Sequence, residues 1–161
     1  MREFLIVYYS RSGKTAMAAR MLAEMLGADI EEIREQRSFT GCVGWAKALI
    51  CALKKEGARL VSTHSQAGDR TLILGMPVWA ASVPPAVLEY LRTVQVSKPM
   101  YAFCTLDGSG SKGLFKKLRA LAPNLSSNTL AIIKPAKDVE RLRKTLLAWA
   151  DAIRSSAGRG A

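Results

Sequence analysis

The sequence predicts a three-layer α/β sandwich built around a parallel β-sheet. Three observations support this prediction: continuous apolar runs of strand length, amphipathic segments of helical spacing between them, and a fivefold alternation of the two along the chain. Continuous apolar runs are typical of strands that are covered on both faces, as in a parallel sheet. Alternating strands and helices place helices on both faces of such a sheet.

The first half of the chain contains three of the expected strands. These strands cover residues 4–9, 28–33 and 71–76. The expected helices of this half cover residues 15–26 and 41–55. In the first helix the apolar residues Ala18, Met21, Leu22 and Met25 recur at helical spacing. Gly27 suits the end of that helix, because glycine adopts the left-handed conformation of a C-cap readily.

The second half continues the alternation with strands over 99–105 and 129–133. A helix is expected to open at Pro84-Pro85, since proline suits a first helical turn, and a second covers 111–121. The clearest helix covers 138–153, because its apolar positions are spaced 3, 4, 3 and 4 residues apart, at Val139, Leu142, Leu146, Trp149 and Ile153. We expect one domain over residues 1–154 and a disordered polar tail over 155–161.

The composition narrows the class of protein. No apolar stretch reaches the roughly 18 residues that a membrane span needs, and the N-terminus has no signal-peptide pattern, so we expect a cytoplasmic protein. Cys42, Cys51, Cys104 and the single histidine, His64, lack the spacing of zinc ligands. We therefore expect reduced thiols and no metal site.

Positive charge is concentrated in the last third of the chain. The net charge is +11, and residues 112–161 hold 11 Lys or Arg against 3 Asp or Glu. Such a surface can attract nucleic acid, anionic lipid or an acidic partner protein, or it can be a solvated face without a dedicated partner. Nucleic acid is disfavoured, because aromatic residues do not interleave with the basic ones.

Polar loops follow the first, third and fourth expected strands. They are Ser10 to Thr15, Pro77 to Val83, and Thr105 to Ser111. Because the carboxyl ends of parallel strands meet at one edge of the sheet, we expect these loops to converge there. Ligands of open α/β sheets bind beyond that edge.

The first of these loops has the composition of a phosphate site. Three hydroxyls, of Ser10, Ser12 and Thr15, surround Gly13, which lets the backbone turn tightly. The following helix offers free N–H groups and the positive end of its dipole. A helix cap without a ligand is the open alternative. A nucleoside-triphosphate P-loop is excluded, because Tyr8 stands where that motif needs glycine, and a cysteine phosphatase is excluded because the loop has no thiol.

The loops resemble those of flavodoxin-like proteins. The phosphate loop of that family is similar to Tyr8-Tyr9-Ser10-Arg11-Ser12-Gly13-Lys14-Thr15, and the second flavin loop of its short-chain members is similar to Gly75 to Pro85, GMPVWAASVPP. Thr105 to Gly110 stands where the third loop belongs. The resemblance spans nearly the whole chain. It implies a five-stranded sheet of order 2-1-3-4-5, FMN at its edge, and electron transfer.

The resemblance also implies the residues of an FMN site. The phosphate would be surrounded by Ser10, Arg11, Ser12, Gly13, Lys14 and Thr15. The isoalloxazine ring would be lined on one side by Pro77, Val78, Trp79 and Ala80, and on the other by Thr105, Leu106, Asp107 and Gly108. Trp79 would stack on the ring, unless it is an ordinary packing tryptophan. No residue stands out as a catalytic acid or base.

Two functional hypotheses follow. The first is an FMN-dependent protein that transfers electrons or reduces a small acceptor such as a quinone, with NAD(P)H or a protein as electron donor. Electron-carrying flavodoxins are usually acidic, so this basic chain would dock an acidic redox partner through its C-terminal third. The second is a binding module of flavodoxin fold that has lost FMN, since Ala81, Leu106 and Asp107 depart from the family pattern. Ser38 to Gly57 is interpreted as extra core packing or as a wall over a substrate pocket.

Overall fold

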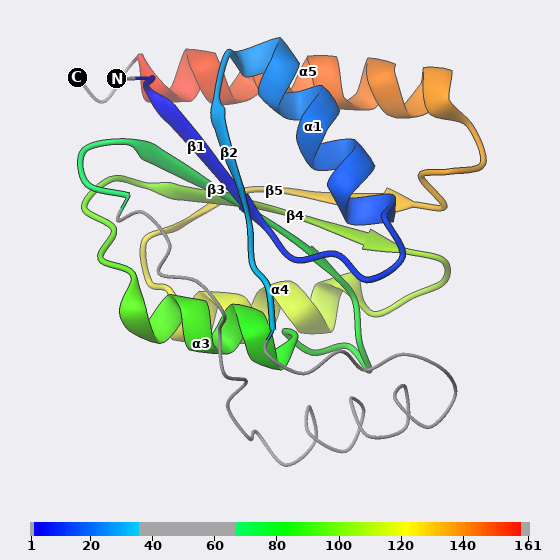
Figure 1. Cartoon of the computed structure of the whole chain (residues 1–161), viewed down its shortest axis with the longest axis horizontal. Coiled ribbons are helices and arrows are strands. Elements are labelled where there is room, and N and C mark those ends of the chain that lie inside the picture. Colours follow the sequence, from blue (N-terminus) through cyan, green and yellow to red (C-terminus); the bar gives the residue numbers. More distant parts are fainter. Residues whose placement is uncertain (1, 36–66, 159–161) are drawn as a thin grey trace.

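A computed structural model describes residues 2–35 and 67–158 of the chain. Its strands form one parallel sheet of order β2-β1-β3-β4-β5, so the expected fold class and strand order are confirmed (Figure 1). The strands are β1 (Phe4–Tyr8), β2 (Asp29–Glu32), β3 (Thr71–Pro77), β4 (Met100–Leu106) and β5 (Leu125–Ile133). The expected helix over 41–55, the segment Ser38 to Gly57, Cys42, Cys51 and His64 lie outside the described residues.

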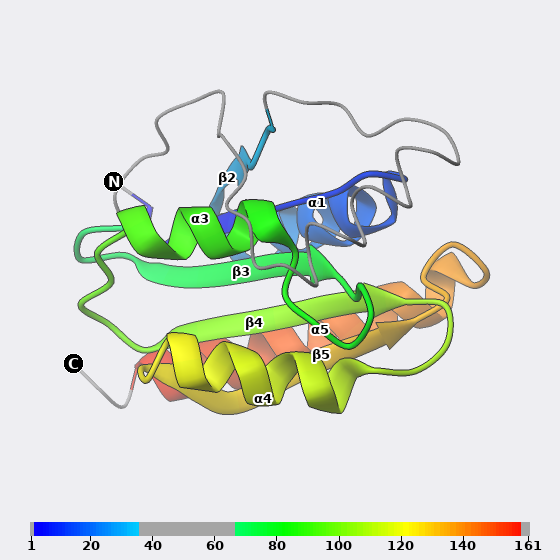
Figure 2. The same cartoon turned by 90° about the horizontal axis from the view of Figure 1, so that it is seen from below.

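Helices cover both faces of the sheet (Figures 1 and 2). They are α1 (Lys14–Leu26), α3 (Pro85–Thr93), α4 (Ser111–Leu121) and α5 (Val139–Ala157). Helices α1 and α5 pack against the face that presents Ile6 and Phe103, whereas α3 and α4 pack against the face that presents Val7 and Cys104. Neighbouring strand residues point to opposite faces, so the continuous apolar run of β1 serves both layers.

The last helix is longer than the sequence predicts. It continues to Ala157, so residues 155–157 are helical and the expected disordered tail is wrong for them. Ser155 and Ser156 donate their hydroxyls to the carbonyls of Asp151 and Ala152, at 2.9 and 2.8 Å. Serine side chains that bond back in this way are accommodated inside a helix, which a polar composition alone does not reveal.

Strand β5 also begins earlier than expected, at Leu125 rather than at residue 129. Its register against β4 shifts: Met100 pairs with Leu125, and Ala102 pairs with Thr129. The polar residues before Thr129 lie in a strand that ends the order of the sheet, where a solvent-facing side is tolerated. The sequence pattern therefore did not predict the first part of β5, residues 125–128, because these residues are mostly polar.

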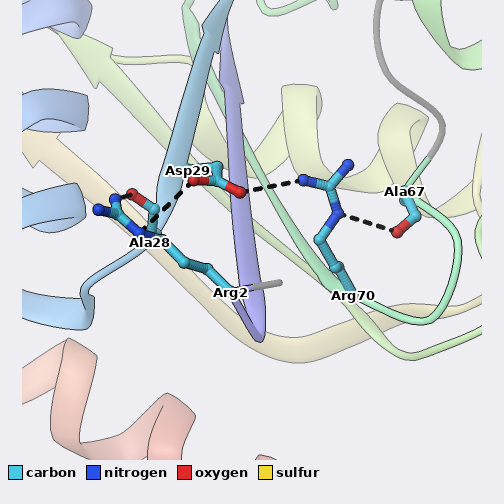
Figure 3. A network of polar contacts seen from close by, with 5 residues as sticks. All are labelled: Arg2, Ala28, Asp29, Ala67 and Arg70. Atoms are coloured by element: carbon cyan, nitrogen blue, oxygen red, sulfur yellow. Dashed lines mark hydrogen bonds and ion pairs between the residues drawn. The ribbon is translucent and has the colours of Figure 1, made fainter.

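At the amino ends of the strands, a small polar network fixes β2 (Figure 3). The Asp29 carboxylate forms ion pairs with two arginines. Nη1 of Arg70 lies 3.3 Å from Oδ2 of Asp29, and Nε of Arg2 lies 3.6 Å from its Oδ1. Arg70 also donates to the carbonyl of Ala67, and Arg2 to that of Ala28. This network stabilises the end of the sheet opposite to the three polar loops.

Two absences hold for the described part of the chain, residues 2–35 and 67–158. No helix in it has both the length and the apolar character that crossing a bilayer requires. No group of three or more His, Cys, Asp or Glu in it is arranged to hold a metal ion. Burial raises the pKa of the Cys104 thiol to about 12, so this thiol is protonated and poorly nucleophilic at neutral pH.

Candidate functional site

The three polar loops meet at the carboxyl ends of the strands. Figure 1 shows the connections after β1 and β4 at the same end of the sheet. The N–H of Val78, which directly follows β3, donates to the carbonyl of Thr105 at 3.0 Å. Pro77 pairs with Thr105 in the sheet register. The second and third loops therefore leave neighbouring strands side by side.

The first loop, Ser10 to Thr15, which we call the phosphate-type loop, turns sharply at Gly13 before α1 begins. Gly13 has φ 80° and ψ −11°, a left-handed conformation that glycine adopts without strain. A Cβ at Gly13 would meet no atom within 4 Å, so the backbone conformation, rather than crowding, favours glycine. The Ser10 hydroxyl accepts from the N–H of Ala16 at 3.3 Å. Ser12 is exposed, and Gly13 as the N-cap residue has no side chain to cap the helix.

Two side-chain contacts join this loop to the third loop. The hydroxyls of Thr15 and Thr105 lie 2.7 Å apart, and both residues are buried. The Lys14 Nζ lies 2.6 Å from Oδ2 of Asp107. The partners of these contacts are 90 and 93 positions apart in sequence, so the fold alone brings them together. Asp107 is thus paired with a cation at the edge of the sheet.

The second loop makes a strained tight turn. Ala80 and Ala81 have φ 47° and 52°, and the N–H of Ser82 donates to the carbonyl of Trp79 at 2.8 Å. Two successive left-handed residues are typical of a type I′ turn, in which each non-glycine residue costs about 1–2 kcal/mol. Ala81 therefore adopts the conformation that a glycine would adopt at this position. A Cβ on Gly113 would lie 3.1 Å from the Cβ of Ala81, so the turn packs closely against α4.

Trp79 is oriented by two neighbours. The ring of Tyr9 meets it edge-on, with centroids 5.5 Å apart and an interplanar angle of 82°. The guanidinium carbon of Arg11 lies 5.4 Å from the Trp79 ring centroid, within the range of a cation–π interaction. Trp79 is half-buried, so part of its surface is accessible to a ligand.

Behind Tyr9 lies Glu35, a residue that sequence reasoning missed. The Tyr9 hydroxyl and the Glu35 carboxyl are hydrogen-bonded. Burial raises the pKa of Glu35, while this hydrogen bond and the charge of Arg11 oppose the rise. Burial and the charge of Glu35 raise the pKa of Tyr9 well above its usual range. Glu35 follows β2 without any motif, so its role depends on a contact that only the fold makes.

Leu106, which is expected beside a flavin ring, is mostly buried. Its side chain is buried in the core under α3 and α4, so only its backbone is available at the site. Its carbonyl accepts from the N–H of Lys134 at 2.8 Å. Asp107 and Gly108, by contrast, are exposed. The tip of the third loop is therefore more accessible than the leucine side chain before it.

A cavity of about 480 Å³ adjoins the outer side of the phosphate-type loop. It is lined by Ser10, Arg11, Gly13, Ala16, Met17, Arg20, Met21, Glu24 and Glu32. It shares the phosphate-type loop with the candidate site, but no residue of the second or third loop lines it. We therefore place the candidate site among the three loops rather than in this cavity.

Solved structures of other proteins share the fold of this chain. A protein from Bacteroides uniformis that is assigned as a flavoprotein has a TM-score of 0.79 and 19% identity, covering 93% of this chain and 98% of its own. A flavoprotein from Lactobacillus acidophilus in complex with FMN has a TM-score of 0.71 and 17% identity, covering 88% and 99%. Oxidised flavodoxin 2 from Bacillus cereus has a TM-score of 0.60 and 18% identity, covering 96% and 99%.

At these identities the structural likenesses establish the fold. No match was found among curated proteins. The model of the flavodoxin family matches residues 3–152, nearly the whole chain. The chain therefore belongs to the flavodoxin family.

Proposed function

We propose that this protein binds FMN at the three loops and uses it to transfer electrons or to reduce a small acceptor such as a quinone. The observation that supports this most is the pair of contacts, Thr15 to Thr105 and Lys14 to Asp107, that joins the phosphate-type loop to the third loop. These contacts bring the two loops together, so a cofactor with a phosphate at one end and a flat ring at the other would contact both. The L. acidophilus relative in complex with FMN is consistent with the proposal.

The donors at the first loop suit a phosphate dianion. The left-handed Gly13 and the start of α1 provide backbone N–H groups, Ser12 provides an exposed hydroxyl, and Lys14 provides an ammonium. Charge-assisted bonds of this kind are about twice as strong as neutral ones. The ammonium of Lys14 can exchange Asp107 for phosphate at little cost, because a partly exposed ion pair contributes only about 0–1 kcal/mol.

The second loop suits a flat aromatic ring. Tyr9 and Arg11 fix the plane of Trp79, so the indole needs little rearrangement when a ring stacks on it. The flavin, when bound, supplies the redox chemistry. The residues of the chain bind its phosphate, orient its ring and set the charge around it, with Asp107 neutralised by Lys14 or exposed beside the ring.

The visible absorption spectrum of the purified protein tests this proposal. We expect flavin absorption bands, or an apoprotein that quenches the fluorescence of added FMN, followed by oxidation of NADH or NADPH when a quinone is supplied. Circular dichroism serves as the control for folding. A folded protein without measurable FMN affinity would contradict the proposal and favour a binding module that has lost its cofactor. FMN binding without NAD(P)H oxidation would indicate a protein electron donor.

A further inference from the structure

The connection from β5 to α5 forms an exposed basic corner, which we define as residues 133–144. It holds five basic residues, Lys134, Lys137, Arg141, Arg143 and Lys144, and all are exposed. Two acidic residues, Asp138 and Glu140, lie among them. Two large apolar side chains are exposed in the same segment: Ile133 at 59% and Val139 at 48%.

The basic corner adjoins the third loop. Ile133 pairs with Leu106 in the sheet register, and the N–H of Lys134 donates to the carbonyl of Leu106 at 2.8 Å. Asp107 and Gly108 follow Leu106 directly. Figure 1 shows the β5–α5 connection at the same end of the sheet as the connections after β1 and β4. A protein docked on the corner would therefore lie next to the proposed flavin site.

The two carboxylates within the basic corner cancel part of its positive charge. The Asp138 side chain accepts from the N–H of Arg141 at 2.9 Å and caps α5. Glu140 is exposed in the first turn of α5. With five cations against two carboxylates, the corner is electropositive.

Lys134 has a backbone conformation that glycine adopts more readily than lysine. Lys134 has φ 50°, a left-handed conformation that costs a lysine about 1–2 kcal/mol. Its side chain is exposed, so core packing does not require it. Strained residues concentrate at functional positions, and here the strained residue is a lysine whose N–H bonds to the residue before Asp107.

We propose that the basic corner docks an acidic electron-transfer protein that exchanges electrons with the flavin; this inference rests on the proposed binding of FMN. Apolar residues at the centre and charged residues at the rim are typical of protein–protein interfaces. Exposed Ile133 and Val139 favour a protein over nucleic acid, because they offer nothing to a phosphate backbone. Reduction of FMN to FMNH₂ would take one electron from each of two reduced carriers and two protons from water.

The test uses the full chain loaded with FMN and a reduced plant-type [2Fe–2S] ferredoxin, an acidic one-electron carrier, as probe. Stopped-flow absorption measures the second-order rate constant of flavin reduction at several salt concentrations. For Lys137→Glu we expect a rate constant about tenfold lower at low salt, because steering by opposite charge raises association rates by about 10–1000-fold. The wild-type rate constant should fall steeply as salt rises.

A matched control is Arg119→Glu, which makes the same charge change in the last turn of α4, at the far end of that helix from the third loop. We expect its rate constant to stay within about twofold of the wild type, since screening limits charge effects to about 10 Å at moderate salt. Ile133→Ala should weaken binding of the ferredoxin without changing the salt dependence.

Three results would overturn the docking surface. They are an unchanged rate constant in Lys137→Glu, a wild-type rate constant that does not depend on salt, and a short DNA duplex that binds the corner more tightly than the ferredoxin does. Flavin content is measured first by absorption. A chain that holds no FMN contradicts the proposed function, whereas a loaded chain that fails these comparisons contradicts only the docking surface.

Discussion

Lys14→Met is expected to lower the affinity for FMN about 10- to 100-fold, because a hydrogen bond to a charged group contributes about 1.5–3 kcal/mol. Asp107→Asn should raise the affinity instead. In the present structure the Lys14 ammonium lies 2.6 Å from the Asp107 carboxylate, so this carboxylate competes with phosphate for the same cation. Titration of each apoprotein with FMN, followed by quenching of flavin fluorescence, measures both changes.

Lys14→Arg provides the control, since it keeps the charge and should retain most of the affinity for FMN. The free energy of unfolding of the apoprotein should change by less than about 1 kcal/mol in both Lys14→Met and Asp107→Asn, because a partly exposed ion pair contributes little. If Asp107→Asn weakens FMN binding as much as Lys14→Met does, the pair holds the loops together and does not compete with phosphate.

Gly75→Ala is expected to lower the free energy of unfolding by about 1–3 kcal/mol, the usual effect of overpacking a core. A Cβ at Gly75 would lie 2.4 Å from Cζ and 2.7 Å from Cε1 of Phe103. The Phe103 ring is fully buried and packs edge-on against Trp149, with centroids 6.1 Å apart, so it cannot move aside freely. Urea denaturation of the apoprotein measures the change.

Two further variants test whether contact with Phe103 causes the expected loss of stability in Gly75→Ala. Gly108→Ala adds the same methyl group where no atom lies within 4 Å, so its free energy of unfolding should change by less than about 0.5 kcal/mol. Gly75→Ala combined with Phe103→Leu removes the ring and should be less destabilised than the sum of the two single variants. Additive losses would show that contact with Phe103 is not the cause.

Much of the fold could be predicted from local patterns. The apolar runs of β1, β3 and β4 are buried on both faces, and such runs are typical of parallel sheets. The errors fell where polar residues belong to regular structure. Strand β5 starts at Leu125 because an edge strand tolerates polar residues, and α5 reaches Ala157 because serine hydroxyls bond back to helical carbonyls.

The candidate site could be predicted only in part. The positions of the three loops follow from strand order and from the convergence of parallel strand ends. The partner of Lys14, the burial of Thr15 against Thr105 and the inward turn of Leu106 depend on contacts between segments distant in sequence. Glu35 lies in no motif, so nothing in the sequence indicated its bond to Tyr9.

The most direct test of the account compares FMN with riboflavin, which has the same ring but no phosphate. If the loop from Ser10 to Thr15 binds the phosphate, FMN should bind about 100-fold or more tightly than riboflavin, because two or more charge-assisted bonds at about 1.5 kcal/mol each are lost with the phosphate. In Lys14→Met the difference between the affinities for FMN and riboflavin should become smaller. Equal affinities of the wild-type chain for FMN and riboflavin would contradict the phosphate site.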